Sequence, residues 1–198
     1  MKIGFYRHGP TAWNHQKRLQ GRTDVGLTDE ARVWLAAHRL PGGFQHARCL
    51  ASPLIRAVET AELLSPVAVE LEPALIEANW GDWEGKTIAQ LRAADPEGMA
   101  RAEDKGLDMT PPNGESPRDV CKRLSGWLAI LAQAGGEQPL LAVTHKGVIR
   151  AAMALATGWD FIGKPPVKLD WQSLHVFEVG PDGTLSMADI NIPLETRP

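Results

Sequence analysis

Short apolar runs alternate with amphipathic stretches along most of the chain. The runs at residues 2–6, 47–51 and 139–143 have the length of buried strands, and a further short run lies at 67–71. Between these runs, apolar residues recur at the spacing of a helix that buries one face. This alternation predicts an α/β fold with a mostly parallel sheet.

Capping residues predict where several of the helices begin. Thr28 precedes one amphipathic stretch, Thr87-Ile88-Ala89-Gln90 has the form of a capping box, and Ser116 opens another helix. The helix after Ser116 is expected to end at Gly135-Gly136, and its apolar stripe consists of Val120, Leu124, Trp127, Leu128 and Leu131. Ser52-Pro53 predicts a further helix, with the serine at the N-cap and the proline at the first helical position.

The remaining segments complete one predicted domain. Residues 147–156 are expected to form a helix, and residues 174–179 and 184–190 two strands joined by a Pro-Asp-Gly turn. The charged segment 98–114 is expected to form a loop and a short helix that cap or close over a site. Because no repeat or linker divides the chain, residues 1–198 are predicted to be a single domain.

Composition and charge restrict the classes of partner. With 43 % hydrophobic and 23 % charged residues among 198, the chain has the composition of a globular protein. A net charge of −3 argues against a nucleic-acid partner, and no apolar run is long enough to span a membrane. The first residues lack the features of a secretory signal, so a cytoplasmic protein is expected, with Cys49 and Cys121 as reduced thiols.

Three side chains that suit phosphate chemistry follow three different predicted strands. His8 follows the first strand, His145 follows the run that ends at residue 143, and Arg56 lies in the helix after the second run. Ligands collect at the carboxyl ends of parallel strands, so these side chains are expected to meet in one pocket. Arg56, four residues after Ser52, is also expected to lean toward the helix N-terminus, whose N–H groups favour an anion.

The combination of arginines and histidines indicates a ligand with concentrated negative charge. The guanidinium groups of Arg7 and Arg56 suit bidentate contact with phosphate oxygens. The same cations are expected to lower the pKa of a neighbouring imidazole, which keeps it neutral and nucleophilic. No group of His, Cys and Asp residues has the spacing of metal ligands, so an enzyme without a metal ion is predicted.

Several short motifs follow one another along the chain: Arg7-His8-Gly9, Gln20-Gly21-Arg22, Ser52-Pro53-Leu54-Ile55-Arg56, Glu77, Gly81-Asp82-Trp83-Glu84-Gly85 and Thr144-His145-Lys146-Gly147. Together, from about residue 2 to about residue 191, they resemble the histidine phosphatase superfamily, which includes the cofactor-dependent phosphoglycerate mutases. The resemblance implies a three-layer α/β/α sandwich. It also implies that His8 attacks phosphorus to form a phosphohistidine, which water then hydrolyses. Arg7, Arg56 and His145 would stabilise the transferring phosphoryl group.

Two glutamates are candidates for the proton donor to the leaving group. The resemblance favours Glu77, which precedes the turn at residues 81–85, and it places Glu84 in that turn as a support of the site. An acid that works at neutral pH needs a raised pKa, and a partly desolvating wall of Trp80 and Trp83 would raise the pKa of Glu77.

The resemblance also implies a set of residues around the phosphate and the substrate entrance: Thr11, Asn14, Gln20, Gly21, Arg22 and Lys146. Two positions depart from the family pattern, because Pro10 stands where many members carry Glu or Gln, and Lys146 replaces a glycine. The backbone N–H of Lys146 can still donate to phosphate, whereas its side chain has no assigned role. Arg118, Lys122 and Arg123 are expected to face solvent.

These observations favour a phosphomonoesterase that needs no cofactor and acts on a small phosphorylated substrate. A phosphoglycerate mutase is the alternative, but the segment before the second histidine lacks the adjacent Arg-Arg pair that mutases use for a carboxylate. A non-catalytic member that binds a phosphorylated ligand or a protein partner is a further alternative, and the intact catalytic set argues against it.

The turn at residues 80–85 resembles that of the α-ribazole phosphatases, although other small-molecule phosphatases share such turns. The sequence does not specify the substrate, nor whether the protein is a monomer or a dimer. Segments 98–114 and 159–171 are expected to decide the substrate.

Overall fold

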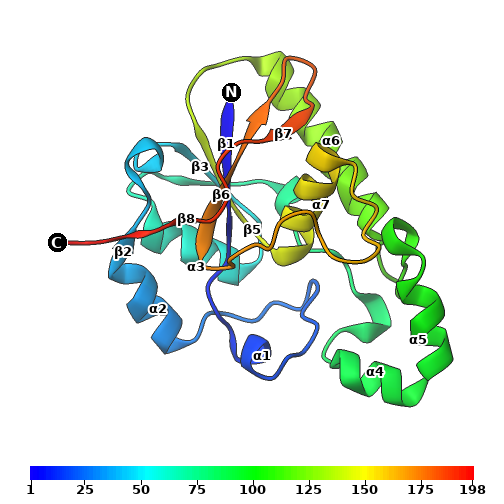
Figure 1. The fold of residues 1–198 in the computed structure, drawn as a ribbon. Coiled ribbons are helices and arrows are strands. Elements are labelled where there is room, and N and C mark those ends of the chain that lie inside the picture. Colours follow the sequence, from blue (N-terminus) through cyan, green and yellow to red (C-terminus); the bar gives the residue numbers. More distant parts are fainter.

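The computed structural model describes residues 1–198 and has a seven-stranded sheet as its central layer (Figure 1). The strand order is β4-β3-β5-β1-β6-β7, and β8 pairs with β6. The four strands β4, β3, β5 and β1 run parallel, whereas β6 runs antiparallel to β1. The strands are β1 (Lys2–Arg7), β3 (Arg48–Ala51), β4 (Val69–Leu71), β5 (Leu140–Thr144), β6 (Ser173–Val179), β7 (Leu185–Met187) and β8 (Ile192–Pro193). A separate pair consists of β2 (His38–Arg39) and β9 (Glu195–Thr196).

Helices cover both faces of the sheet. They are α1 (Ala12–His15), α2 (Asp29–Ala36), α3 (Ile55–Leu64), α4 (Ile88–Ala94), α5 (Pro96–Glu103), α6 (Pro117–Ala134) and α7 (Lys146–Thr157). Figure 1 shows α6 and α7 on one side of the sheet and α2 and α3 on the other. The prediction of an α/β/α sandwich with a mostly parallel sheet is therefore confirmed.

Alternate residues of the central strands contribute to two separate hydrophobic cores. Ile3 and Phe5 of β1 are buried with Leu128 of α6, whereas Tyr6 is buried with Ala61 of α3. This alternation follows from the two-residue period of a strand, which directs successive side chains to opposite faces. The two cores therefore lie on opposite faces of the sheet.

Most of the predicted element boundaries are confirmed. Thr28, Thr87 and Ser116 are the N-caps of α2, α4 and α6, and each side chain accepts a backbone N–H of the first turn. Gly135 ends α6 with a positive φ of 69°. The predicted turn at residues 181–183 joins the antiparallel strands β6 and β7.

The helix after β3 begins two residues later than predicted. It starts at Ile55 and has no side-chain cap, so the placement of Ser52 at the N-cap is wrong. The Ser52 N–H extends the ladder between β3 and β5, and its hydroxyl is bound by His145. The N–H of Ile55 donates to the Asp24 carboxylate at 2.8 Å, so a carboxylate of the protein already occupies this helix end.

The charged segment 98–114 was expected to form a loop and a short helix. Residues 96–103 form the helix α5. The chain that follows is held at both ends: Asp108 forms an ion pair with Arg118, and the Glu115 N–H donates to the carbonyl of Asn79. The cap or lid role of residues 98–114 stays a prediction.

The prediction that Arg123 faces solvent is wrong. Only 20 % of its side chain is exposed, because the guanidinium reaches inward to two backbone carbonyls beneath α6. Arg118 and Lys122 are exposed, as expected.

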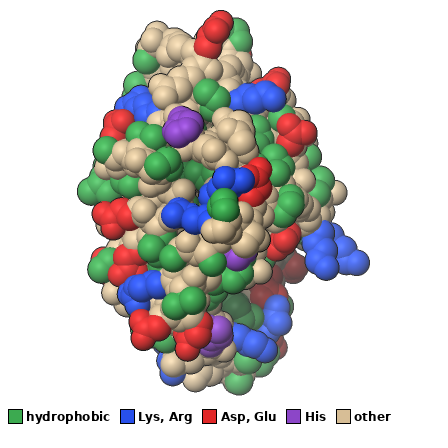
Figure 2. Space-filling model, turned by 90° about the vertical axis from the view of Figure 1, so that its left-hand side faces the viewer, with side chains coloured by type: hydrophobic (Ala, Val, Ile, Leu, Met, Phe, Trp, Pro, Cys, Tyr) green, Lys and Arg blue, Asp and Glu red, His purple; other side chains and the backbone are tan.

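Acidic and basic side chains are intermingled on one face of the molecule. On the face seen in Figure 2, basic and acidic side chains alternate, with hydrophobic side chains scattered among them. None of the helices has the length and apolar character that crossing a membrane requires.

Candidate active site

His8 and His145 lie side by side at the carboxyl ends of two neighbouring strands. His8 follows β1 directly and His145 follows β5, and the His8 N–H donates to the Thr144 carbonyl at 2.9 Å. The two ring centroids are 5.1 Å apart, and both side chains are buried. The structure thus brings together two histidines separated by more than a hundred residues of sequence.

The hydrogen bond of His8 defines its tautomer. Nδ1 lies 2.7 Å from the carbonyl oxygen of Gly9, and a carbonyl can only accept a hydrogen bond. Nδ1 therefore carries the proton in the neutral ring, and Nε2 retains the lone pair that a nucleophile needs. The loop is fixed from the other side, because the Gly9 N–H donates to the Thr60 hydroxyl at 2.9 Å.

The second histidine is held by a serine. His145 Nε2 lies 2.7 Å from Oγ of Ser52, while its buried Nδ1 has no partner. Sequence analysis assigned Ser52 to a helix cap and missed this contact. Only the position of Ser52 at the end of β3, beside β5, could have indicated it.

Burial and positive charge keep both imidazoles neutral. Burial is the main cause that lowers the pKa of His8 well below its usual value, and Arg7 and Arg56 lower it further. The pKa of His145 is lowered in the same way, first by burial and then by His8 and Arg56. A neutral His8 near pH 7 is the protonation state that nucleophilic attack requires.

Arg7 and Arg56 are positioned in different ways. Arg56, the second residue of α3, is fully buried and donates to the carbonyls of Gly21 at 2.7 Å and Thr23 at 2.9 Å. Arg7 donates no side-chain hydrogen bond, and its buried Nε has no partner, like Nε of Arg56. Buried donors are normally paired, so unpaired ones beside two histidines indicate an anion-binding pocket.

Glu77 lies against the N-terminal turn of α7. Its Oε1 accepts the N–H of Ala78 at 2.9 Å and that of Gly147 at 3.1 Å. Burial raises the pKa of this carboxyl, although the two N–H groups, Arg56 and Arg123 act in the opposite direction. A Cβ at position 147 would lie 2.3 Å from Oε1, so only glycine fits there without displacing Glu77. A buried carboxyl of raised pKa is suited to donate a proton.

Arg123 holds the segment that leads to Glu77. It donates from Nη1 to the carbonyl of Ala74 and from Nη2 to that of Ile76, and its Nε lies 3.5 Å from the Glu115 carboxylate. The same segment is fastened to β5 by the Thr144 hydroxyl, which donates to the carbonyl of Leu75 at 2.6 Å. Sequence analysis missed Arg123, because nothing in the helical pattern distinguishes it from its exposed neighbours.

Glu84 is saturated by hydrogen bonds from the adjoining loop. Its carboxylate accepts the N–H groups of Arg22 at 2.8 Å and Thr23 at 2.9 Å, the Thr23 hydroxyl at 2.6 Å and the N–H of Trp80 at 3.3 Å. Gly21 has a φ of +53°, and a Cβ there would lie 1.9 Å from Oε1 of Glu84. Glu84 thus braces the loop whose carbonyls hold Arg56.

The remaining candidates make contacts with one another and with neighbouring loops. The Thr11 hydroxyl lies 3.0 Å from Oε1 of Gln20 and 3.2 Å from Oδ1 of Asn14, and the Thr11 backbone N–H donates to Oδ1 of Asn14 at 3.0 Å, so one residue orients both amides. Arg22 is paired with Glu115 at 3.0 Å. The Lys146 ammonium lies 5.2 Å from the ring centroid of Trp171 and has no carboxylate partner.

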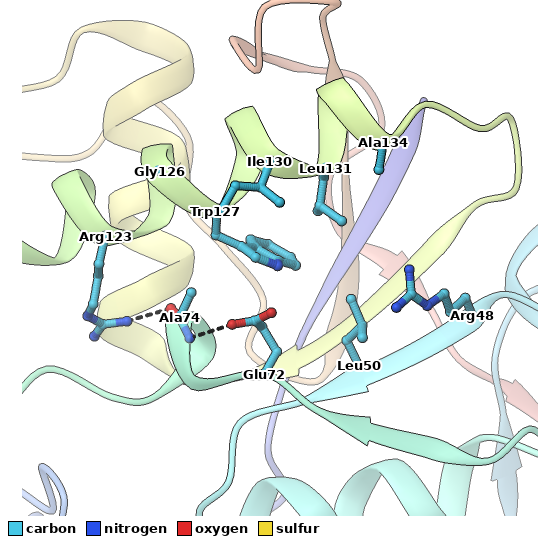
Figure 3. Close-up of a pocket in the computed structure, with 10 residues that line it drawn as sticks. All are labelled: Arg48, Leu50, Glu72, Ala74, Arg123, Gly126, Trp127, Ile130, Leu131 and Ala134. Carbon is cyan, nitrogen blue, oxygen red and sulfur yellow. Dashed lines mark hydrogen bonds between the residues drawn. The ribbon is translucent and has the colours of Figure 1, made fainter.

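A groove of about 590 Å³ lies elsewhere, between α6 and strands β3 and β4 (Figure 3). Figure 3 shows Trp127 lying in it beside Glu72, with Arg123 and Ala74 at one end. Its polar side chains are already bonded, Glu72 to the N–H of Ala74 and Arg48 to Glu70. Neither His8 nor His145 lines the groove, so it is separate from the pair of histidines. No group of three or more His, Cys, Asp or Glu side chains is placed to hold a metal ion.

Comparison with known proteins gives consistent matches. The model of the "Histidine phosphatase superfamily (branch 1)" matches residues 3–191. Relatives from Mycobacterium, one described as a bifunctional protein of Mycobacterium tuberculosis, are 31 % identical over 190 residues and cover 93 % of this chain. The chain spans about half the length of these relatives (52 %).

Relatives of similar length also match. The glucosyl-3-phosphoglycerate phosphatase of Mycolicibacterium vanbaalenii is 32 % identical over 178 residues, covering 82 % of this chain and 79 % of that protein. A mycobacterial glucosyl-3-phosphoglycerate phosphatase solved with VO3 superposes with a TM-score of 0.81 at 25 % identity, covering 96 % of this chain and 98 % of its own. A candidate α-ribazole-5′-phosphate phosphatase of Escherichia coli gives a TM-score of 0.79 at 25 % identity and covers 96 % of each chain.

Proposed function

The chain belongs to the histidine phosphatase superfamily (branch 1), and from this membership we propose that it hydrolyses the phosphate monoester of a small metabolite through a phosphohistidine on His8. The strongest support is the set of unpaired buried nitrogens around a neutral histidine: Nε of Arg7, Nε of Arg56 and Nδ1 of His145. Such a set leaves donors available for the oxygens of a phosphate.

In the first step, Nε2 of His8 attacks phosphorus and the bond from phosphorus to the ester oxygen breaks. Glu77, whose pKa is raised by burial, gives its proton to the leaving oxygen, and the alcohol departs. Arg7 and Arg56 balance the charge that spreads over the phosphoryl oxygens in the transition state.

In the second step, water attacks the phosphohistidine. The Glu77 carboxylate takes a proton from the water, the bond from Nε2 to phosphorus breaks, and inorganic phosphate leaves. The Nδ1–H of His8 stays bound to the carbonyl of Gly9 during both steps, so the ring keeps its orientation. No step requires a metal ion or a cofactor. A cytoplasmic location is part of the proposal and agrees with two free thiols, Cys49 and Cys121.

The first test is hydrolysis of p-nitrophenyl phosphate in excess chelator, with the wild type and His8→Ala compared. We expect turnover by the wild type that resists the chelator, and a loss of at least about 10³-fold in kcat in the variant. His46→Ala is the matched control, because His46 is exposed and precedes β3, at the edge of the sheet opposite to the carboxyl ends of the strands.

Retained activity in folded His8→Ala would remove His8 as the nucleophile. If the wild type does not hydrolyse the ester but exchanges phosphoryl groups between small phosphoacids, the mutase alternative replaces this proposal.

A further inference from the structure

Two of the arginines differ from the others because their side chains form no hydrogen bond and no ion pair. Of the thirteen arginines in the sequence, ten donate at least one side-chain hydrogen bond to a carboxylate, a carbonyl or an amide oxygen, and Arg22 forms an ion pair with Glu115. Arg7 and Arg150 donate none. Arg7 lies in the phosphate pocket, and Arg150 lies on α7, the helix that follows His145.

Lys146 lies one turn before Arg150 on the same helix and also has no partner. Like charges four residues apart on a helix repel each other, and cations in the first turn are disfavoured by the helix dipole. The first turn of α7 contains no acidic residue that would offset them. Burial is the main cause that lowers the pKa of Lys146, and the charges of Arg150 and Arg7 lower it further, while Glu77 acts in the opposite direction. Glu77 is the carboxyl that acts against this repulsion, but it forms no ion pair with Lys146 or Arg150.

Aromatic rings hold these cations in place. The guanidinium of Arg7 lies 5.8 Å from the ring centroid of Trp171, and Lys146 lies 5.2 Å from the same centroid. These two cations are therefore no more than about 11 Å apart. Arg150 lies 4.9 Å from the ring of Trp159 and 4.8 Å from that of Phe161, which stack on each other. Ring faces orient a cation and leave its N–H groups free to bind an anion.

We propose that Lys146 and Arg150, together with Trp171, form a second anion subsite beside the phosphate pocket, so that the substrate carries a second oxyanion, a carboxylate or a phosphate. The inference rests on the proposed function. His8 and Arg56 would bind the phosphate that is removed, Arg7 would lie between the two groups, and α7 would supply the cations for the second group. The rings belong to segment 159–171, which was expected to decide the substrate.

The test compares three phosphate esters of one carbon skeleton. Glycerol 3-phosphate has a single anionic group, 3-phosphoglycerate adds a carboxylate, and glycerol 1,3-bisphosphate adds a phosphate. We expect wild-type kcat/KM to be at least about tenfold higher for one of the two doubly charged esters than for glycerol 3-phosphate. A single charge-assisted hydrogen bond provides a difference of this size. In Lys146→Met and Arg150→Met, this preference falls by about tenfold or more. Lys122→Met, an exposed lysine on α6, leaves it unchanged.

A binding experiment separates failure of the subsite from failure of the proposed function. His8→Ala cannot turn over the esters, so calorimetry gives their dissociation constants directly, alone and combined with Lys146→Met. A preference for a doubly charged ester that disappears with Lys146→Met supports the subsite even if the wild type hydrolyses none of them. Equal affinity for all three esters, or a preference that both α7 variants retain, overturns it. The arm that shows the preference identifies the second group as carboxylate or phosphate.

Discussion

The phosphate pocket and the loops beside it satisfy their polar groups in opposite ways. In the pocket, buried nitrogens of Arg7, Arg56 and His145 have no hydrogen-bond partner and no carboxylate in contact, whereas Nε of Arg123, also without a hydrogen bond, lies 3.5 Å from the Glu115 carboxylate. Beside it lies a support cluster of Arg22, Thr23, Glu84, Glu115 and Arg123, where the two carboxylates accept hydrogen bonds or ion pairs from several donors.

Two glutamates in one short segment illustrate the difference. Glu77 is buried and its carboxyl has a raised pKa, whereas Glu84 accepts four hydrogen bonds from the loop. An unpaired buried donor costs about 1–3 kcal/mol, so the pocket lowers the stability of the fold until an anion binds. The support cluster contributes the rigidity that keeps the pocket open.

Among the replacements that test the difference between Glu77 and Glu84, Glu77→Gln should give the largest loss of activity. In Glu77→Gln, the side-chain oxygen can still accept the N–H groups of Ala78 and Gly147, but the proton is lost. We expect kcat to fall by about 10²-fold or more on an alkyl phosphate and by less than about tenfold on p-nitrophenyl phosphate, whose leaving group needs little protonation. Steady-state kinetics on both esters measure the difference.

The wild-type rate on the alkyl phosphate should also fall as the pH rises through the raised pKa of Glu77, because the carboxyl loses the proton it must donate. An equal loss on both esters in the variant would assign Glu77 to positioning and not to proton transfer.

Replacement of Glu84 should affect stability more than chemistry. Glu84→Gln weakens hydrogen bonds from Arg22, Thr23 and Trp80, and we expect the free energy of unfolding to drop by about 2 kcal/mol. Activity should decline to the same extent on both esters, since the loop that holds Arg56 loosens. Urea titration and kinetics together measure the two effects.

Asp82→Asn is the matched control, because Asp82 lies in the same turn but is exposed and accepts hydrogen bonds from Asn113 alone among side chains. The control should change stability by less than about 0.5 kcal/mol. A leaving-group-dependent loss in Glu84→Gln would instead make Glu84 the proton donor.

A fall in pH should lower the free energy of unfolding through His8 and His145, and this effect should be smaller than those of the two glutamate replacements. The pKa values of His8 and His145 are lowered in the folded state, so below about pH 6.5 only the unfolded chain takes up their protons. Stability is therefore present above pH 6.5 and is lost as the pH falls, by up to about 1.4 kcal/mol per pH unit for each histidine. His8→Asn should reduce the slope between pH 6.5 and 5.5 in urea titrations, and exposed His46→Asn should not. An unchanged slope in His8→Asn would show that this ring is not held neutral.

The convergence of His8, Arg56 and His145 was predictable, because strands that run parallel place their following residues at one edge of the sheet. The start of α3 was not, since the local Ser-Pro signal was overridden when the Ser52 hydroxyl bound His145. The inward direction of the Arg123 side chain was also not predictable, because its two carbonyl partners lie about fifty residues earlier in the chain. Contacts between distant loops have no local pattern, and here they provide the support of the site and not its reactive groups.

The position of β1 at the centre of the sheet has a consequence for how the protein folds. Its two neighbours are β5 and β6, and Ile3 pairs with Leu140 on one side and with Phe177 on the other. During synthesis, β1 thus precedes both partners by more than a hundred residues, and closing such long loops makes the pairing slow. Until then, both edges of an apolar strand stay open to other chains, which makes partly synthesised or partly refolded protein prone to aggregation. Because His8 directly follows this strand, catalytic competence arises only when the last central strands are in register.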